Sequence, residues 1–381
     1  MDINNFMAVL DGLGADFFTG VPDSLLRPFT DYIMRKYGVS ANHVVAANEG
    51  AAVGLAAGHY LATSKPAVVY MQNSGIGNAV NPVSSLIHKK IYAIPVIFVI
   101  GWRGEPGVKD EPQHLFQGEI TLSLLDCLEI PYTVIAKDTE YSELSSKLGE
   151  LKDCINGGQS VAFVIKNNAL QNKDKYAYHS GAELSREQTL RIIMDNADKN
   201  DNNDVYICTT GKLSREVFEL RENAGRGHER DFLTVGSMGH SIMIAYGVAL
   251  SKPGRRVVCL DGDGAAVMHL GSLAVTGVSG LANILHIVIN NGAHETVGGI
   301  PVVSAHLNLS ETALTLGYRH AYRVADEDGL RSALNETQAL DGPVFMEVMC
   351  NLESRADLGR PTTTPIQNKN SFMSYLMEEP K

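Results

Sequence analysis

The sequence predicts an α/β protein built from two doubly wound parallel-sheet domains of similar topology. Apolar runs of strand length alternate with helical segments through the first half of the chain, and the same alternation restarts in the second half. Alternation of this kind is typical of parallel sheets that helices cover on both faces. Between the halves, residues 166–185 are polar and without period, which indicates a linker. We therefore place the domains at 1–170 and 186–381, with 171–185 as the linker.

In the first half, strand-like runs rich in β-branched residues are separated by segments of helical periodicity. Strands are expected within 15–22, 43–48, 65–75, 93–101, 131–135 and 160–165. Helices are expected at 25–38, 49–64, 76–90 and about 141–155. We expect Asp23 and Ser24 to cap the first of these helices, despite Pro28 inside it.

The second half repeats the pattern. Strands are expected within 204–211, 231–236, 257–264, 284–290, around 321 and within 343–349. Helices are expected from 186, at 213–220, at 240–251, between 264 and 284, at 309–318 and near 330–340. The tail after Asn351 contains several Pro and Thr residues, and we expect an exposed or partner-contacting arm.

Two strand ends in the second half carry polar residues suited to a metal ion. The run Val257–Leu260 ends on Asp261-Gly262-Asp263-Gly264, and the run Ile284–Ile289 ends on Asn290-Asn291-Gly292. A helix joins the two strands, so both finish at the same edge of the sheet. Carboxylate, amide and carbonyl oxygens suit Mg²⁺, and bare glycines let the backbone approach a diphosphate. Taken alone, Gly-Asp-Gly is also typical of a turn in which the glycines are needed for steric reasons only and no metal binds.

Other polar turns follow strand ends. Thr209-Thr210-Gly211-Lys212 and Gly236-Ser237-Met238-Gly239-His240 each lie between a strand and a helix, where backbone N–H groups hold anions. Gly20–Ser24 and Gln72–Asn78 take the corresponding places in the first half. Glu49 opens a helix directly after a strand and, alone, is typical of an acidic residue favoured by the helix dipole. Met238, alone, is typical of core filler.

Composition and charge exclude several classes of protein. An apolar fraction of 44% and a charged fraction of 20% are typical of a globular protein, and 381 residues suffice for two cores. A net charge of −11 argues against nucleic-acid binding and against attachment to a membrane surface. The N-terminus does not have the pattern of a signal peptide, and no apolar run has membrane-spanning length. The five cysteines have no paired spacing, which indicates buried, reduced thiols in a cytoplasmic protein.

Gly262-Asp263-Gly264, followed one helix later by Asn-Asn, resembles the thiamine diphosphate motif of the decarboxylase and acetolactate synthase superfamily. The resemblance implies thiamine diphosphate and Mg²⁺ as cofactors. It implies Asp263 as a metal ligand, Asn291 as the second oxygen ligand and Ala293 as a carbonyl ligand. The spacing is one residue longer than usual, so Asn290 is the alternative. The other residues implied to contact the cofactor are Gly75, Thr210, Gly211, Gly236, Met238, Gly262, Gly264 and Ala265.

Glu49 also fits this superfamily, in which a glutamate follows a strand of the first domain and precedes a small-residue helix. The implied role is a hydrogen bond to N1′ of the aminopyrimidine ring. That bond favours the imino tautomer, whose nitrogen removes the C2 proton of the thiazolium. Met238 fits the bulky apolar residue that keeps the cofactor bent. The cofactor then carries the chemistry, while the protein supplies orientation and electrostatics.

The motifs GVPDSLL, MQNSGIGNAVNP, GEPGVKDEPQH, TTGKLSRE and GSMGHSIMIAYGVAL span both halves and resemble the phosphonopyruvate decarboxylases. The sulfopyruvate decarboxylases are close relatives that typically divide the two halves between chains. The resemblance implies conversion of 3-phosphonopyruvate to phosphonoacetaldehyde and CO₂ in phosphonate biosynthesis of the 2-aminoethylphosphonate type. It implies two domains without the middle domain of most thiamine diphosphate decarboxylases. It also implies a homo-oligomer, at least a dimer, with active sites at subunit interfaces.

A phosphonate substrate needs cations around its charged end, because burying that charge unpaired is prohibitive. We expect Arg103 and Lys109 to hold the phosphonate, with Lys212 as the next candidate. The alternative is that these cations pair with acidic neighbours such as Asp110, Glu111 and Glu216.

The expected catalytic residues complete the first-half site. They are Glu49, His114 within reach of the reacting carbon or the carboxylate, and Asp23 and Ser24, whose turn faces the substrate in the family that this sequence resembles. Another 2-keto acid, sulfopyruvate among them, is the alternative substrate. A dinucleotide-binding dehydrogenase fails because no Gly-x-Gly-x-x-Gly turn with a following ribose-binding acid is present. A non-catalytic thiamine diphosphate-binding protein is the remaining alternative.

Overall fold

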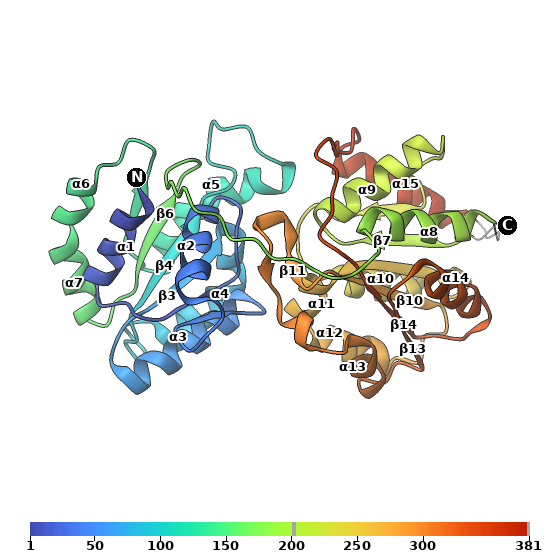
Figure 1. Cartoon of the computed structure of the whole chain (residues 1–381), viewed down its shortest axis with the longest axis horizontal. Coiled ribbons are helices and arrows are strands. Elements are labelled where there is room, and N and C mark those ends of the chain that lie inside the picture. Colours follow the sequence, from blue (N-terminus) through green and yellow to red (C-terminus); the bar gives the residue numbers. More distant parts are fainter. Residues whose placement is uncertain (200–202, 379–381) are drawn as a thin grey trace. The chain divides into compact units, whose positions relative to one another are not determined.

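The computed structural model describes residues 1–199 and 203–378, which form two compact units. The first unit comprises Met1–Ala177 together with Val297–Ile300, and the second comprises Tyr178–Thr296 together with Pro301–Lys381. The main division, between Ala177 and Tyr178, falls inside the segment 171–185. In each unit helices flank a central sheet (Figure 1).

The first unit contains a six-stranded parallel sheet in the order β2-β1-β3-β4-β6-β5. Its strands are β1 (Phe18–Gly20), β2 (His43–Val45), β3 (Ala67–Gln72), β4 (Val96–Gly101), β5 (Tyr132–Ile135) and β6 (Val161–Ile165). Its helices are α1 (Ile3–Gly12), α2 (Arg27–Tyr37), α3 (Glu49–Thr63), η1 (Asn73–Gly75), α4 (Ile76–Pro82), η2 (Val83–Ile87), α5 (Pro112–Cys127), α6 (Tyr141–Ser146) and α7 (Leu148–Asn156).

The second unit also contains a six-stranded parallel sheet, in the order β13-β14-β10-β9-β7-β8. Its strands are β7 (Val205–Cys208), β8 (Asp231–Leu233), β9 (Val257–Gly262), β10 (Ile284–Asn290), β13 (His320–Val324) and β14 (Val344–Met349). Its longer helices are α8 (Arg186–Lys199), α9 (Lys212–Asn223), α10 (Ser241–Ser251), α11 (Asp263–Met268), α12 (Gly271–Gly277), α13 (Leu309–Thr315), α14 (Glu327–Glu336) and α15 (Pro365–Met377). The short elements after β10 are β11 (Ala293–His294), η3 (Glu295–Val297), β12 (Ile300–Pro301), η4 (Val303–His306) and η5 (Thr337–Ala339).

Each sheet separates two apolar cores, because its strands are buried on both faces. In the first unit α1, α2, α6 and α7 pack on one face, around Phe6, Phe29 and Phe163, and α3, α4 and α5 pack on the other. In the second unit α8, α9 and α14 cover one face, while α10, α11, α12, α13 and α15 cover the other. The predicted fold of two doubly wound parallel sheets is confirmed.

The two sheets also share one topology. Counted along each unit, the strands follow the order 2-1-3-4-6-5 in both sheets. The first and third strands are therefore neighbours, and the chain reverses its direction of winding between them. Ligands of open α/β sheets bind outside the carboxyl ends of the strands at such a switch point. In the second unit this point lies between β7 and β9, directly before Thr209 and Asp263.

The start of α2 corrects one expectation. The helix begins at Arg27, after Leu26, and no side chain caps it. Pro28 explains the late start, because proline fits the first turn of a helix and not its interior. Asp23 and Ser24 therefore lie in a turn ahead of the helix, which leaves their side chains available to other groups.

The tail and the cysteines also depart from what the sequence suggested. Helix α15 begins with a capping box of Thr364 and Gln367 and packs Phe372 into a core of the second unit, so the tail is not an exposed arm throughout. All five cysteines are free, but Cys127 is exposed and Cys154 is partly exposed, so burial holds for the other three.

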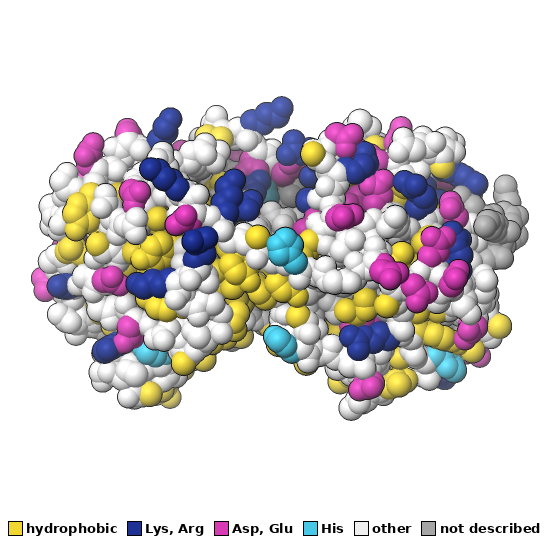
Figure 2. Space-filling view, viewed as in Figure 1, with side chains coloured by type: hydrophobic (Ala, Val, Ile, Leu, Met, Phe, Trp, Pro, Cys, Tyr) yellow, Lys and Arg dark blue, Asp and Glu magenta, His cyan; other side chains and the backbone are white. Residues whose placement is uncertain are grey.

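The surface shows mixed charge. On the face drawn in Figure 2, basic and acidic side chains are interspersed over both units. Within the described residues no helix combines the length and apolar character needed to cross a bilayer.

Candidate functional site

Glu49 lies at the first turn of α3, immediately after the strand-end residues of β2. Asn48 caps this helix by accepting a hydrogen bond from the Ala51 N–H, and the Glu49 side chain is buried, with 5% of the residue exposed. Asn78 Nδ2 donates to Glu49 Oε2 at 2.7 Å. One carboxylate oxygen is thus oriented by α4.

Gly75 leaves the space that this carboxylate occupies. A Cβ atom at position 75 would lie 2.5 Å from Glu49 Oε1 and 2.7 Å from its carboxyl carbon. Contacts that short are not tolerated, so any larger residue displaces Glu49. The turn after β3 and the start of α3 are therefore fitted to one another.

Asp23 is the second buried carboxylate of the first unit. Its Oδ2 accepts a hydrogen bond from the Leu25 N–H at 2.9 Å, and only 2% of the residue is exposed. Burial raises its pKa to about 6, against the opposing effects of this bond and of Arg103. A carboxyl group with such a pKa is able to hold or release a proton near neutral pH.

Arg103 follows β4 and binds two partners. Its Nε donates to Asp110 Oδ2 at 2.8 Å, its Nη2 contacts the other Asp110 oxygen, and its Nη1 donates to Ser24 Oγ at 2.9 Å. Asn73 fixes the backbone beneath it, donating to the Arg103 carbonyl at 2.8 Å and accepting from its N–H at 3.1 Å. Burial alone would raise the pKa of Asp110, but hydrogen bonds from Arg103 and nearby N–H groups hold that pKa far below its usual range.

The other two predicted residues of this loop differ in environment. His114 is partly buried, and burial together with Arg103 lowers its pKa to about 4, so the imidazole is neutral near pH 7. Lys109 is exposed and forms no ion pair in the part of the chain that the structure describes. The structure thus gathers Asp23, Ser24 and Arg103, and leaves Lys109 at the surface.

Asp263 begins α11 at the end of β9, and 4% of it is exposed. Ser304 Oγ donates to Asp263 Oδ2 at 2.5 Å, and the backbone N–H groups of Gly264 and Gly292 also point to the carboxylate. Burial raises its pKa to about 6, more than these donors lower it. Because Gly292 follows β10, the two strand ends meet here as expected.

The two asparagines at the end of β10 have different partners. Asn290 is fully buried; its Nδ2 donates to Glu347 Oε1 on β14 at 2.7 Å, and its Oδ1 accepts from the Gly292 N–H at 3.0 Å. Asn291 Nδ2 donates to Glu295 Oε2 at 3.2 Å, and its Oδ1 accepts from the Ala293 N–H at 3.1 Å. Asn290 thus joins two strands, while Asn291 lies within the turn.

Met238 and His294 lie over the Gly262–Ala265 turn. A Cβ atom at Gly264 would be 3.1 Å from His294 Cε1 and 3.4 Å from Met238 Cε. Burial lowers the pKa of His294 to about 4. Met238 belongs to the loop that contains Gly236, so this loop approaches the Asp263 turn.

The turn after β7 is open above its backbone. Gly211 precedes α9 with φ of +100° and has no atom within 4 Å of where a Cβ would lie. Thr210 Oγ1 donates to the Val235 carbonyl at 2.9 Å, which ties this turn to the loop after β8. The turn has the form of an anion-binding helix start.

Lys212 is held in a network of charged groups. Its Nζ donates to Glu295 Oε1 at 2.8 Å and to Ser354 Oγ at 2.5 Å. Arg186 binds Glu295 and also both oxygens of Glu216, at 2.6 and 2.7 Å. Burial would raise the pKa of Glu295, but the two cations hold it below its usual value.

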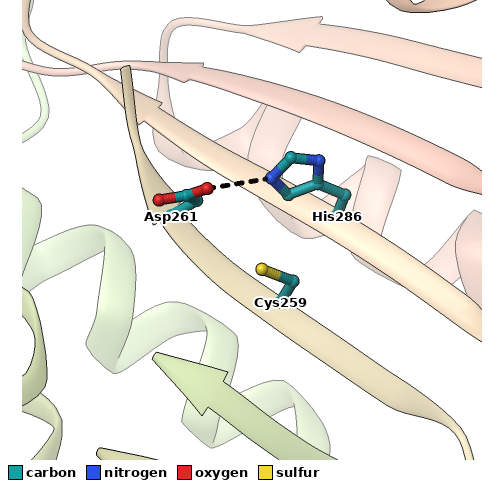
Figure 3. A group of neighbouring side chains, drawn as sticks. All are labelled: Cys259, Asp261 and His286. Carbon is teal, nitrogen blue, oxygen red and sulfur yellow. Dashed lines mark ion pairs between the residues drawn. The ribbon is translucent and has the colours of Figure 1, made fainter. Parts of the chain in front are cut away.

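A separate group of buried ionisable side chains, Cys259, Asp261 and His286, lies deeper in the second sheet (Figure 3). His286 is opposite Cys259 in the β9–β10 register, and its Nε2 lies 3.4 Å from Asp261 Oδ2. All three residues are fully buried, and burial raises the pKa of the Cys259 thiol well above its usual value. A metal ion would bind Cys259 as the thiolate, and the raised pKa of the thiol disfavours that form. Since Asp261 Oδ1 also accepts from the Gly262 N–H at 2.9 Å, the group supports the strand end that precedes Asp263.

Sequence reasoning missed several residues of these sites. Ser304 and Arg186 are far from Asp263 and Glu295 along the chain, and no motif marks them. Asn78 belongs to the strand-end turn Gln72–Asn78, and membership of that turn was the signal that could have identified it.

Comparison with known proteins gives the family. The model described as thiamine pyrophosphate enzyme, N-terminal TPP binding domain, matches residues 4–125, and the corresponding C-terminal TPP binding domain matches residues 209–348. A phosphonopyruvate decarboxylase of Streptomyces viridochromogenes is 31% identical over 391 aligned positions, which cover 99% of this chain and 95% of the relative. The chain belongs to the thiamine pyrophosphate-dependent decarboxylases.

Two further relatives refine the type of decarboxylase. A phosphonopyruvate decarboxylase of Streptomyces hygroscopicus is 30% identical, and the alignment covers 98% of this chain and 94% of the relative. A sulfopyruvate decarboxylase of Methanosarcina acetivorans is 24% identical over 78% of this chain and 79% of its own length. This decarboxylase is therefore an enzyme of the phosphonopyruvate and sulfopyruvate type, as the sequence motifs predicted, and the dehydrogenase reading is excluded.

The Glu49–Gly75 contact generates a prediction for this decarboxylase. We expect Gly75→Ala to lower the stability of the first unit by about 1–3 kcal/mol, because the methyl group overpacks a filled space. Gly77→Ala is the matched control, since a Cβ at position 77 meets nothing within 4 Å and an alanine favours the helix. Urea unfolding followed by circular dichroism compares them. Equal midpoints for Gly75→Ala and the wild type would contradict the contact.

Proposed function

We propose that this decarboxylase converts 3-phosphonopyruvate to phosphonoacetaldehyde and CO₂, with thiamine diphosphate and Mg²⁺ as cofactors. The observation that carries the proposal is the full-length similarity to two phosphonopyruvate decarboxylases, at 31% and 30% identity. The similarity to the sulfopyruvate decarboxylase is lower and covers less of the chain. Decarboxylation of sulfopyruvate is therefore the second candidate.

The chemistry of the donor set around Asp263 fits a divalent cation. In the described residues this buried carboxylate forms no ion pair with a lysine or arginine, and only neutral donors point to it. Mg²⁺ bound by Asp263, Asn291 Oδ1 and the Ala293 carbonyl would neutralise the carboxylate and hold diphosphate oxygens. Asn290 is the weaker candidate, because it is fully buried at the end of β10 and its amide binds Glu347 on the neighbouring strand, whereas Asn291 lies in the turn beside Ala293.

The remaining contacts to the diphosphate would come from open backbone. The backbone after Gly211 at the start of α9, and that of Gly262–Ala265 at the start of α11, would face the diphosphate at the switch point of the second sheet. Gly236 and Met238 would lie against the middle of the cofactor. The proximity of Met238 Cε to Gly264 supports this position.

When bound, thiamine diphosphate supplies the carbon that attacks a 2-keto group and accepts the electron pair released with CO₂. Glu49 would hydrogen-bond the aminopyrimidine through the oxygen that faces Gly75, while Asn78 holds its other oxygen. Asp23, Ser24 and the neutral His114 would face the substrate. Asp23 has a raised pKa, so it is suited to hold the proton that the product needs.

Arg103 is the candidate for the phosphonate. Its bonds to Asp110 and Ser24 fix the guanidinium plane and leave part of its five N–H groups for a ligand. Lys109, exposed and without an ion pair among the described residues, would close over the anion from the loop. Lys212 is a poorer candidate than the sequence suggested, since Glu295 and Ser354 already bind it.

We also propose the assembly and setting that the family resemblance implied. The enzyme would be a homo-oligomer with active sites at subunit interfaces, cytoplasmic, and part of phosphonate biosynthesis. Five free cysteines fit a reducing compartment.

A parallel substrate assay tests the proposed reaction. We expect CO₂ release from 3-phosphonopyruvate to exceed release from sulfopyruvate and pyruvate, because the doubly charged phosphonate gains most from Arg103. The pure protein is incubated with thiamine diphosphate and Mg²⁺, and kcat/KM is measured for each substrate. A higher kcat/KM for sulfopyruvate would replace the proposal by the second candidate.

Asp263→Ala tests the metal site. We expect Mg²⁺ and thiamine diphosphate to be lost together, because a diphosphate without its cation is no longer held. Calorimetric titration of the cofactor with and without Mg²⁺ measures this. Asp357→Ala, which removes an exposed carboxylate, is the control. Unchanged Mg²⁺-dependent affinity in Asp263→Ala would remove Asp263 from the site.

Arg103→Ala and Lys109→Ala test the recognition of the phosphonate. We expect KM for phosphonopyruvate to rise roughly 10- to 100-fold in Arg103→Ala, as for a lost hydrogen bond to a charged group, and less in Lys109→Ala. The KM for pyruvate should change little. Lys173→Ala is the control on an exposed lysine of the same unit. A wild-type preference in both variants would place the phosphonate elsewhere.

A further inference from the structure

The Asn291 amide has one neighbour that decides its orientation. A side-chain amide has an oxygen at one end and an NH₂ group at the other. The oxygen accepts hydrogen bonds, whereas the NH₂ group donates them, so the neighbours decide which way the amide is turned. A carboxylate accepts hydrogen bonds and does not donate them. Since Glu295 Oε2 lies 3.2 Å from Asn291 Nδ2, the NH₂ end must face Glu295. The oxygen end then faces the Ala293 N–H, at 3.1 Å, within the turn whose Gly292 N–H points to Asp263.

Glu295 is itself held firmly. Lys212 Nζ binds its Oε1 at 2.8 Å, and Arg186 binds its Oε2. Arg186 is in turn fixed by both oxygens of the buried Glu216, and Lys212 by Ser354. Two cations and two carboxylates thus balance one another, and the Glu295 side chain is 8% exposed. Such a network holds one arrangement because each buried charge has its partners.

We propose that Glu295 is a positioning residue that turns the oxygen of Asn291 toward the metal, so that Arg186 and Lys212 act on metal affinity through it. The inference rests on the proposed function only in taking Asn291 as a metal ligand. Groups that orient metal ligands typically change metal affinity 10- to 100-fold when they are removed. Glu295 itself would not touch the metal, the cofactor or the substrate.

The first test is Glu295→Gln in the full-length protein with thiamine diphosphate. A glutamine is able to donate as well as accept, so the Asn291 amide loses its fixed orientation. We expect the Mn²⁺ affinity, measured by electron paramagnetic resonance, and the Mg²⁺ affinity, measured by competition, to fall roughly 10- to 100-fold. Glu222→Gln is the matched control, because it removes a carboxylate of the same unit that binds His228 and, among the described residues, has no bond to Asn291, Arg186 or Lys212. The metal affinity of this control should stay near that of the wild type.

A second background separates orientation from simple loss of negative charge. In the Asn291→Asp variant both terminal atoms of the side chain are oxygens, so metal binding no longer depends on how the side chain is turned. The Glu295 carboxylate also repels the new carboxylate. Adding Glu295→Gln to Asn291→Asp should therefore leave metal affinity unchanged or raise it. A loss of charge near the metal predicts a fall in both backgrounds instead.

The outcomes are distinct. Wild-type metal affinity in Glu295→Gln, or an equal fall in both backgrounds, overturns the positioning role. Wild-type metal affinity in Asp263→Ala would show that the metal site itself is misplaced, which concerns the proposed function. The role is supported if Glu295→Gln lowers the metal affinity of the wild-type protein but leaves unchanged or raises that of the Asn291→Asp variant.

Discussion

The structure depends on one geometric constraint, the common carboxyl edge of each parallel sheet. Because every strand runs in the same direction, each strand end delivers its next residues to one edge. In the second unit this brings the residues after β7, β9 and β10 together, and in the first unit those after β1, β3 and β4. Polar residues far apart along the chain become neighbours there without any long-range motif.

Burial gives these neighbours their chemical character. Glu49, Asp23 and Asp263 are all nearly inaccessible to water, and the last two have a raised pKa as a result. A buried carboxylate is costly unless donors or a cation compensate it. Asn78, the Leu25 N–H and Ser304 each supply one donor. The incomplete compensation at Asp263 is what supports a cation there.

The sequence was sufficient for the fold and for the strand-end residues, since alternation and strand termination are local properties. It predicted both sheets, the turn containing Asp263 and the helix opened by Glu49. It placed α2 too early, because Asp23 and Ser24 have the composition of a cap while Pro28 sets the actual start. It also left the partners of Arg103 and Lys212 open. Glu295 lies 83 residues from Lys212, and no local pattern encodes that pairing.

The equal strand orders of the two sheets have a consequence for how the chain is made. All six strands of the first sheet precede Ala177, and only Val297–Ile300 joins that unit from the second half. Domains generally fold as units during synthesis, which proceeds at about 5–20 residues per second. The first unit therefore has on the order of ten seconds or more to complete its sheet while the ribosome is still making the second. The strands of the first unit thus pair with one another before a second set of similar strands emerges, which limits pairing between strands of different halves.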